Sequence, residues 1–407
     1  MREGIADGKL GGVGRLTLVL GAIMALGPLA LDMYLPALPM LEAEFAATPA
    51  RVQHTVSAYL LGMALGQFAM GPLSDRFGRK PPLLGGLFLF AVASAGCALA
   101  QHIEGLVLLR FAQALGGSSI MVVVRAVIRD RFDAIQSAQV LSLMMLVMGA
   151  APILAPLAGG WLLIAASWHW IFWLLAAYAL FCIATAFFLL DESHPVHARS
   201  VSIGGALAAM LPLARHRLFV GPALVFMFSF GAFFSYLAAA PFVFIQYFGV
   251  PAERFGIYFG VNAFGFIMVS QLNRRLVHGR GPRKVLGWGV GILAAAAAGL
   301  ITCALTGLGG FAAVFAALFF VVASLGLIAS NVSAVAMAPF GDRAGGAASL
   351  LGFSQALTGV VASAAVGWIP GEGALAMASV VAVCAAVSLV SYLTLVRSDR
   401  VRPASPS

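Results

Sequence analysis

The sequence predicts an all-α integral membrane protein with twelve transmembrane helices in two six-helix bundles. Its 407 residues are 61% hydrophobic and only 10% charged, whereas a soluble domain carries about 25% charged residues. Twelve charge-poor stretches are long enough to cross a bilayer, which takes about 20 apolar residues in a helix. The predicted helices are 16–41, 52–72, 81–101, 105–128, 137–163, 168–190, 218–246, 255–276, 284–305, 311–336, 344–369 and 374–396.

A longer polar segment near the middle separates two sets of six helices. A short internal similarity agrees with two related halves, because Gly78-Arg79-Lys80 opens the third helix and Gly281-Pro282-Arg283-Lys284 opens the ninth. Transporters often consist of such repeats, with the substrate site between them. The predicted organisation is an N-terminal bundle over 1–190, a cytoplasmic linker over 191–217, a C-terminal bundle over 218–396 and a cytoplasmic tail over 397–407.

The basic residues indicate the orientation in the membrane. With a cytoplasmic N-terminus, all but four of the 24 Lys and Arg residues fall on cytoplasmic segments. Arg51 and Arg254 lie outside, and Arg110 and Arg125 lie within predicted helices. This distribution follows the positive-inside rule. We therefore expect a multi-pass protein of the bacterial inner membrane with both termini cytoplasmic. The net charge of +9 then reflects topology and contact with headgroups of the lipid bilayer, not nucleic-acid binding.

One acidic residue interrupts the first predicted helix. Asp32 follows fifteen uncharged residues, 17–31, and precedes nine more, 33–41. A carboxylate inside a membrane helix is costly to bury, so it usually faces a cavity or a partner and has a function. Asp32 is therefore a candidate proton carrier or a counter-charge for a substrate.

Several enzyme and metal signatures are missing from the sequence. It contains no G-x-x-x-x-G-K-[ST] phosphate loop, no H-E-x-x-H pattern and no nucleophile elbow. We therefore predict a secondary transporter without catalytic residues, metal or cofactor, driven by the proton-motive force. The four cysteines lack CxxC spacing and fall in apolar stretches, where they are expected to be small buried hydrophobic residues: Cys97, Cys182, Cys303 and Cys384.

The loop between the second and third helices, GPLSDRFGRK at 71–80, resembles the cytoplasmic signature G-x-L-[AS]-D-R-x-G-R-[KR] of the major facilitator superfamily. The resemblance implies a latch, in which Asp75 lies near a helix N-terminus of the other half and either Arg76 or Arg79 pairs with Asp130. The alternative is a basic loop that only sets topology. The latch candidates are Gly71, Asp75, Arg76, Gly78, Arg79 and Asp130.

Two further segments resemble motifs of the same superfamily. LRFAQALGG at 109–117 is similar to the fourth-helix motif R-x-x-Q-G-x-G, with Ala114 where Gly is usual. It implies that Arg110 faces a cavity near the first helix and biases the protonation of Asp32. Alternatively, Arg110 snorkels to the headgroups.

MGAAPILAPLAGG at 148–160 is similar to the antiporter signature G-x-x-x-G-P-x-x-G-G, which marks exporters, although Ala151 and Ala155 stand where Gly is expected. Proline removes a helix hydrogen bond, and small residues allow close helix packing. We therefore expect a hinge or seal in this helix. The alternative is an ordinary kinked helix. The hinge candidates are Pro152, Pro156, Gly159 and Gly160.

The segments LDMYLPALP at 31–39 and RAVIRD at 125–130 resemble the bicyclomycin/chloramphenicol-resistance (Bcr/CflA) branch of drug:proton antiporters. This implies the major facilitator fold and a monomeric, proton-coupled multidrug exporter of small lipophilic or antibiotic compounds that works by alternating access. No other acid lies between Arg15 and Asp32, so one carboxylate would serve both proton and substrate. The alternatives are a dedicated proton-coupled carrier of one metabolite, such as a sugar or amino-acid derivative, and a non-transporting membrane receptor.

Aromatic and neutral polar residues within the helices are candidates for the substrate cavity. Each aromatic residue could instead face lipid, and each polar residue could instead bond to a neighbouring helix. The candidates are Tyr34, Gln113, Phe233, Tyr236, Asn262 and Gln355.

Overall fold

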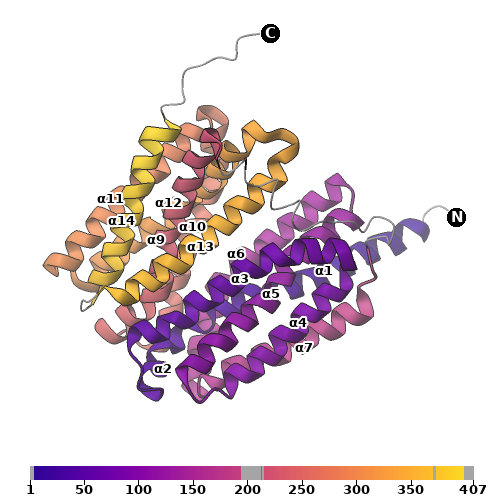
Figure 1. Cartoon of the computed structure of the whole chain (residues 1–407), viewed down its shortest axis with the longest axis horizontal. Helices are drawn as coiled ribbons and strands as arrows, with labels where there is room; N and C mark the ends of the chain where they lie inside the picture. The colour runs from indigo at the N-terminus through magenta and orange to yellow at the C-terminus, as the bar shows by residue number, and fades with distance from the viewer. Residues whose placement is uncertain (1–3, 194–211, 213–214, 370–372, 398–407) are drawn as a thin grey trace, which may run out of the picture. The chain divides into compact units, whose positions relative to one another are not determined.

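The computed structural model describes residues 4–193, 212, 215–369 and 373–397, and within these ranges all regular structure is helical (Figure 1). Twelve of its helices are long and apolar enough to cross a membrane. The predicted all-α fold with twelve spans is therefore confirmed. Cys97, Cys182 and Cys384 are buried, Cys303 is half-buried, and all four are unpaired thiols.

The first half of the chain forms the following helices, with η marking a 3₁₀ or π segment: α1 (Gly4–Asp32), η1 (Leu35–Ala37), α2 (Leu38–Glu44), α3 (Pro49–Phe77), α4 (Lys80–Ala98), α5 (Ile103–Arg131), α6 (Ala134–Ala165) and α7 (His169–Leu189). The second half forms α9 (Arg217–Pro241), η3 (Phe242–Tyr247), α10 (Ala252–Arg280), α11 (Pro282–Thr306), α12 (Gly310–Met337), η4 (Ala338–Arg343), α13 (Ala344–Trp368), α14 (Leu375–Ser391) and η5 (Tyr392–Val396).

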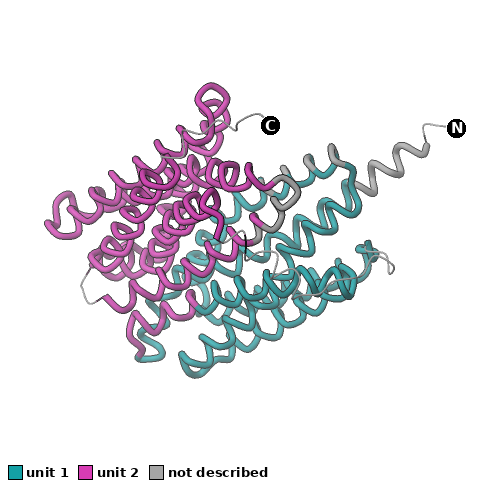
Figure 2. The backbone as a smooth tube through the Cα atoms, turned by 45° about the horizontal axis from the view of Figure 1, so that its top comes forward, with its two compact units in different colours: residues 1–46, 58–202 teal, residues 47–57, 203–407 magenta. Residues whose placement is uncertain are grey.

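The chain folds into two compact units, coloured teal and magenta in Figure 2. Unit 1 contains residues 1–46 and 58–202, and unit 2 contains residues 47–57 and 203–407. The division therefore falls within the predicted linker, 191–217, and the first residues of α3 group with unit 2. In unit 1, α4 packs on α5 and α7, and α1 packs on α6 and α7. In unit 2, α11 packs on α12 and α14, and α9 packs on α13 and α14.

The first predicted span, 16–41, is confirmed as a membrane-length segment over Gly14–Glu44, but its α-helix is interrupted after Asp32. α1 ends at Asp32, a turn follows at Met33 and Tyr34, and the chain resumes as η1. Pro36 supplies the physical reason. In an unbroken α-helix the N–H of residue 36 would bond to the carbonyl of Asp32, and proline has no N–H. Asp32 therefore lies at the end of an α-helix, where the helical hydrogen bonding is interrupted, and not in the middle of a regular helix.

Two helices of unit 2 end in a π-helical turn. α9 passes at Pro241 into η3, and α14 passes at Ser391 into η5. The predicted helices 218–246 and 374–396 were each expected to be uniform. Short π-helical stretches are rare and often occur at functional positions, and both of these border a pocket described below.

Candidate functional site

Asp32 lies at the C-terminal end of α1 with only 6% of its surface exposed. Among the described residues, its carboxylate has no hydrogen-bond or ion-pair partner. Tyr59 on α3 is close enough to interact electrostatically with both Asp32 and Arg110. Buried carboxylates are normally paired, because an isolated charge is costly away from water. An unpaired acid at this position therefore suits a group that takes up and releases a ligand.

Arg110 on α5 is completely buried. Its Nη1 donates to the carbonyl of Ala30, at 2.9 Å, and to Oε1 of Gln113, at 2.6 Å. Its Nε and Nη2 have no partner among the described residues. Ala30 stands two residues before Asp32, so Arg110 contacts the backbone of α1 beside the acid. Snorkelling would require the guanidinium to extend to the surface. It lies instead in the interior of unit 1.

Three aromatic rings surround the Arg110 guanidinium, and we call Tyr34, Tyr59 and Phe172 the Arg110 cage. The guanidinium carbon lies 4.2 Å from the Tyr59 ring centroid, 4.6 Å from Tyr34 and 5.7 Å from Phe172. Cation–π attraction of this kind is strongest where the cation is desolvated. Tyr34, predicted to line the substrate cavity, is therefore placed against Arg110 and is fully buried.

A hydrogen-bond chain from α4 supports Gln113. Nε2 of Gln113 donates to Oγ of Ser94 at 2.7 Å, and Ser94 donates in turn to the carbonyl of Phe90 at 2.7 Å. Because its nitrogen is engaged, the amide presents its oxygen to Arg110. Gln113, also predicted to line the substrate cavity, thus positions the arginine. The role of Ser94 was missed, because a serine within an uncharged predicted helix carries no signal of its own.

The predicted hinge touches the interruption after Asp32. A Cβ added at Gly159 would collide with the carbonyl oxygen of Met33, so only glycine lets α6 pack this closely on the chain. Gly160 and Pro156 are also buried, and Pro152 is half-buried, all within α6. The acid in the first span and the proline–glycine motif in α6 were predicted from separate stretches of sequence. In the structure Met33, the residue after the acid, contacts Gly159 of this motif.

Arg79 is the centre of the predicted latch and is 2% exposed. Its Nε donates to Asp130 at 2.8 Å, and its Nη1 donates to Ser74 at 3.0 Å and to Asp75 at 2.5 Å. Burial alone would lower the pKa of the guanidinium. The hydrogen bonds and negative charges of Asp130 and Asp75 outweigh burial and raise that pKa above its ordinary value. Gly78, at φ +93°, makes the turn that places Arg79 here.

The other latch candidates are arranged differently. Arg79, not Arg76, pairs with Asp130. Arg76 is exposed, and its guanidinium lies 5.3 Å from the Phe77 ring centroid. No described atom lies within 4 Å of a Cβ built at Gly71, so no close helix approach is observed there within the described residues. The carbonyl of Gly71 instead accepts a hydrogen bond from Ser74 at 2.9 Å.

Glu192, just after α7, is a latch residue that sequence reasoning missed. Its two carboxylate oxygens accept the main-chain N–H groups of Arg79, at 2.8 Å, and Lys80, at 3.1 Å. These groups lie at the N-terminus of α4, where unpaired donors and the helix dipole favour an anion. Arg131 donates to the carbonyl of Glu192 at 3.2 Å. No sequence signal singled it out, because an acid in a connection after a helix is unremarkable.

The remaining cavity candidates lie in unit 2. Nδ2 of Asn262 donates to the Tyr236 hydroxyl at 2.9 Å, and Oδ1 of Asn262 is buried without a partner among the described residues. The Tyr236 ring stacks on Phe259, with centroids 5.7 Å apart. Phe233 lies 6.3 Å from Tyr236, whereas Gln355 is half-buried on α13.

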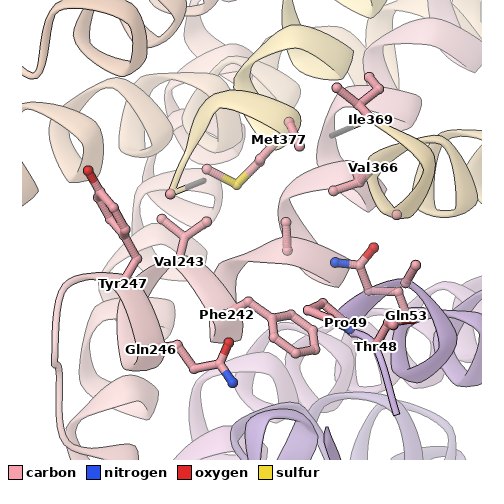
Figure 3. Close-up of a pocket in the computed structure, with 15 residues that line it drawn as sticks. Thr48, Pro49, Gln53, Phe242, Val243, Gln246, Tyr247, Val366, Ile369 and Met377 are labelled. Atoms are coloured by element: carbon pink, nitrogen blue, oxygen red, sulfur yellow. The ribbon is translucent and has the colours of Figure 1, made fainter. Parts of the chain in front are cut away.

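Unit 2 also has a pocket of about 490 Å³, shown in Figure 3. The start of α3 provides Thr48, Pro49 and Gln53, and η3 provides Phe242 and Gln246, with residues of α13 and α14 completing the wall. Gln53 is 4% exposed, and its Oε1 has no partner among the described residues. No predicted cavity residue lines this pocket, because it is built from helix ends that the sequence pattern does not place together.

Comparison with known families gives a consistent result. The sequence pattern of the Major Facilitator Superfamily matches residues 20–363. The chain is 33% identical over 389 residues to the "Uncharacterized MFS-type transporter YdgK" of Bacillus subtilis (strain 168), covering 94% of this chain and 95% of the relative. It is 31% identical over 379 residues to the "Bicyclomycin resistance protein homolog" of Haemophilus influenzae, covering 93% and 95%.

A third relative, the "Multidrug resistance protein MdtL" of Shewanella oneidensis, is 30% identical over 334 residues, covering 81% of this chain and 83% of the relative. Among solved structures, a D-xylose-proton symporter superposes with a TM-score of 0.75 at 16% identity, covering 94% of this chain and 97% of the symporter. The nucleoside transporter NupG (D323A mutant) gives a TM-score of 0.75 at 13% identity, covering 95% and 100%. At such identities the likeness extends to the fold alone.

Proposed function

The chain belongs to the Major Facilitator Superfamily, and from this premise we propose that it exports small lipophilic or antibiotic compounds across the membrane in exchange for protons. The observation that carries the proposal is Asp32. It is buried without a described partner at a helix end. Arg110 bonds to the carbonyl of Ala30, two residues before it, and Gly159 of the exporter-type motif packs on Met33, the residue after it. The names of two relatives, which refer to bicyclomycin and multidrug resistance, support drugs as the substrate class.

In this proposal Asp32 carries either a proton or the charge that attracts the substrate. A buried carboxylate without a partner is costly in its ionised form, so occupation by a proton or by a cationic substrate relieves the same unfavourable state. The proton and the cationic substrate therefore compete for the same carboxylate. Competition at a single acid is sufficient for exchange, provided that the acid is accessible first from one side of the membrane and then from the other.

Arg110 fixes the electrostatic surroundings of the exchange. Its charge is held in place by the Ala30 carbonyl, by Gln113 and by the Arg110 cage. The membrane potential contributes about 2.3 kcal/mol per charge per 100 mV to proton entry.

We assign different parts of unit 1 to the conformational step. The contact of Gly159 with Met33 places α6 where a change in its packing would shift the chain beside Asp32. Arg79 with Ser74, Asp75 and Asp130, which we call the Arg79 cluster, would keep the loop between α3 and α4 in its closed arrangement until the two halves move. The proposed location is the bacterial inner membrane with both termini in the cytoplasm, on the basis of the Lys and Arg distribution. The proposed unit of function is the monomer.

A second candidate is a dedicated proton-coupled carrier of one metabolite. The same fold carries xylose and nucleosides in other proteins, and fold alone does not select the substrate. The unpartnered acceptors of Asn262 and Gln53 favour this candidate, because a site built for one polar compound uses fixed acceptors of this kind. A non-transporting receptor remains the more distant alternative, and it would show no flux.

The proposal is tested in inside-out vesicles with an acidified lumen. We would follow the pH gradient on adding chloramphenicol and several lipophilic cations, for wild type and Asp32→Asn. The matched control is Asp191→Asn, because that carboxylate is 90% exposed. Collapse of the gradient in wild type and in Asp191→Asn, but not in Asp32→Asn, is the expected result. A response that survives Asp32→Asn would contradict coupling through this acid, and no response in any folded protein would favour the dedicated carrier.

A further inference from the structure

Unit 2 has a second pocket, of about 450 Å³, between the start of α11 and the end of α14 with η5. These helices lie side by side (Figure 1). We call the residues that give this pocket its character the basic groove. They are Arg283, Lys284, Trp288, Tyr392 and Arg397.

The floor of the basic groove is made by Tyr392. A Cβ added at Gly287 would collide with the Tyr392 hydroxyl, so glycine at this position allows the ring to lie across α11. The hydroxyl donates to the carbonyl of Arg283 at 3.1 Å. Tyr392 is also the first residue of the π-helical turn η5. The ring is therefore held in place from both helices, and the groove is a defined feature of their packing.

Among the described residues, the charge of the basic groove is of one sign, and no acidic residue lines it. Lys284 and Arg397 are exposed and form no ion pair with any residue in the described ranges. Arg280 adds a further cation at the rim, with its guanidinium 4.9 Å from the Trp288 ring centroid. The groove also faces the N-terminus of α11, which begins at Pro282 and runs to Thr306. Unpaired main-chain donors and the helix dipole favour an anion at this end.

The groove continues into an apolar surface. Next to it, Ile292 is 40% exposed, Leu393 is 43% exposed and Val390 is 57% exposed. On membrane-spanning helices such side chains meet acyl chains. Trp288 and Tyr392 lie between the basic residues and this surface, the position of aromatic residues at the level of lipid headgroups. Cations, then aromatic rings, then exposed aliphatic side chains follow the order of a phospholipid from its phosphate to its tails.

We propose that the basic groove binds an anionic phospholipid, with the phosphate against Lys284, Arg283 and Arg397 and an acyl chain along α11 and α14. Basic pockets between membrane helices are known to hold the headgroups of such lipids. A zwitterionic headgroup would bring a second cation into a groove whose described lining has no acid to receive it. The Lys and Arg distribution assigns the lipid to the cytoplasmic leaflet.

The test uses the full-length protein, purified in detergent and titrated with phosphatidylglycerol, cardiolipin or phosphatidylcholine of matched chains, with bound lipid counted by native mass spectrometry. The groove variant is Lys284→Ala with Arg397→Ala. The control is Arg215→Ala with Arg217→Ala, which removes the same charge from exposed positions of unit 2 outside the groove. We expect the groove variant to bind phosphatidylglycerol and cardiolipin about tenfold more weakly, and the control to bind them as wild type does.

Three outcomes would overturn the proposal: equal weakening in both variants, which indicates net charge alone; no weakening in the groove variant; or equal binding of phosphatidylcholine. Inorganic phosphate serves as a competitor, because its displacement of the lipid would identify a site for the bare anion. A second measurement does not depend on charge variants. Brominated phosphatidylglycerol should quench the fluorescence of wild type more than that of Trp288→Phe, and equal quenching would contradict lipid contact at the groove.

Discussion

Gly159 of α6 packs directly on the main-chain carbonyl of Met33, the residue that follows Asp32. The contact joins the interruption of the first span to the glycine pair of the exporter-type motif. Both features depend on missing groups. Pro36 lacks the N–H that would continue α1, and Gly159 lacks the Cβ that would push α6 away. The position of the acid therefore depends on two helices.

The first prediction concerns Gly159→Ala. The added methyl group meets backbone, which cannot move aside as a flexible side chain can, so we expect a loss of about 1–3 kcal/mol in stability from overpacking and loss of exchange. Gly85→Ala on α4 is the control, because no atom lies within 4 Å of its Cβ position. Thermal unfolding in detergent and the vesicle assay measure the two effects. Wild-type behaviour of Gly159→Ala would contradict the close contact.

The second prediction concerns the shape of the Arg110 side chain. Arg110→Lys keeps the charge but loses the planar group that reaches Ala30, Gln113 and the aromatic rings together. We expect the exchange rate to fall about tenfold or more, equivalent to about 1.4 kcal/mol. Arg275→Lys, at an exposed position of α10, should leave the rate unchanged. Full activity of Arg110→Lys would show that charge alone suffices.

The third prediction tests the support of Gln113 by Ser94. Ser94→Ala leaves Nε2 of Gln113 buried without an acceptor, and an unsatisfied buried donor costs about 1–3 kcal/mol. Gln113→Leu removes the same interaction from the other side. In a double-mutant cycle on the free energy of unfolding, the two changes together should therefore cost less than the sum of the single changes. Strict additivity would show that the hydrogen bond contributes nothing.

The fourth prediction concerns the Arg79 cluster. Asp130→Asn leaves a buried guanidinium with a weaker partner, so we expect a loss of about 3 kcal/mol in stability, whereas Asp191→Asn should be neutral. The pKa of Arg79 is raised by Asp130 and Asp75 after the opposing effect of burial. The stability that this raised pKa provides is complete below the ordinary arginine pKa and is lost only as the pH rises through the raised value.

Through Arg79 itself, the effect of Asp130→Asn should consequently be the same at about pH 6 and about pH 9. Unfolding measured at both values gives the comparison. A loss that disappears at the higher pH would show that another group, and not Arg79, is the partner of Asp130.

Much of the fold could be predicted because its physical origin is local. A run of apolar residues long enough to span a bilayer identifies a helix without any knowledge of its neighbours. The interruption of the helix after Asp32 could also have been predicted, from Pro36. It was overlooked because prolines are tolerated within membrane helices, and hydropathy carries no information on which N–H group is needed.

The site could be predicted only in part. Asp32, Arg110 and Arg79 are recognisable because a charge in or beside a membrane helix is costly and therefore informative. Ser94, Tyr59 and Glu192 gave no such signal, because a serine, a tyrosine or a loop acid is unremarkable in its own segment. Their roles depend on which face of each helix meets which neighbour, and side-chain packing decides that.

Glu192 has a mechanical consequence for the segment that connects the two units. Its carboxylate holds the main-chain N–H groups of Arg79 and Lys80, so the connecting chain is fastened to the turn that presents Arg79. Breaking these two hydrogen bonds would release the segment after α7 from the turn that presents Arg79.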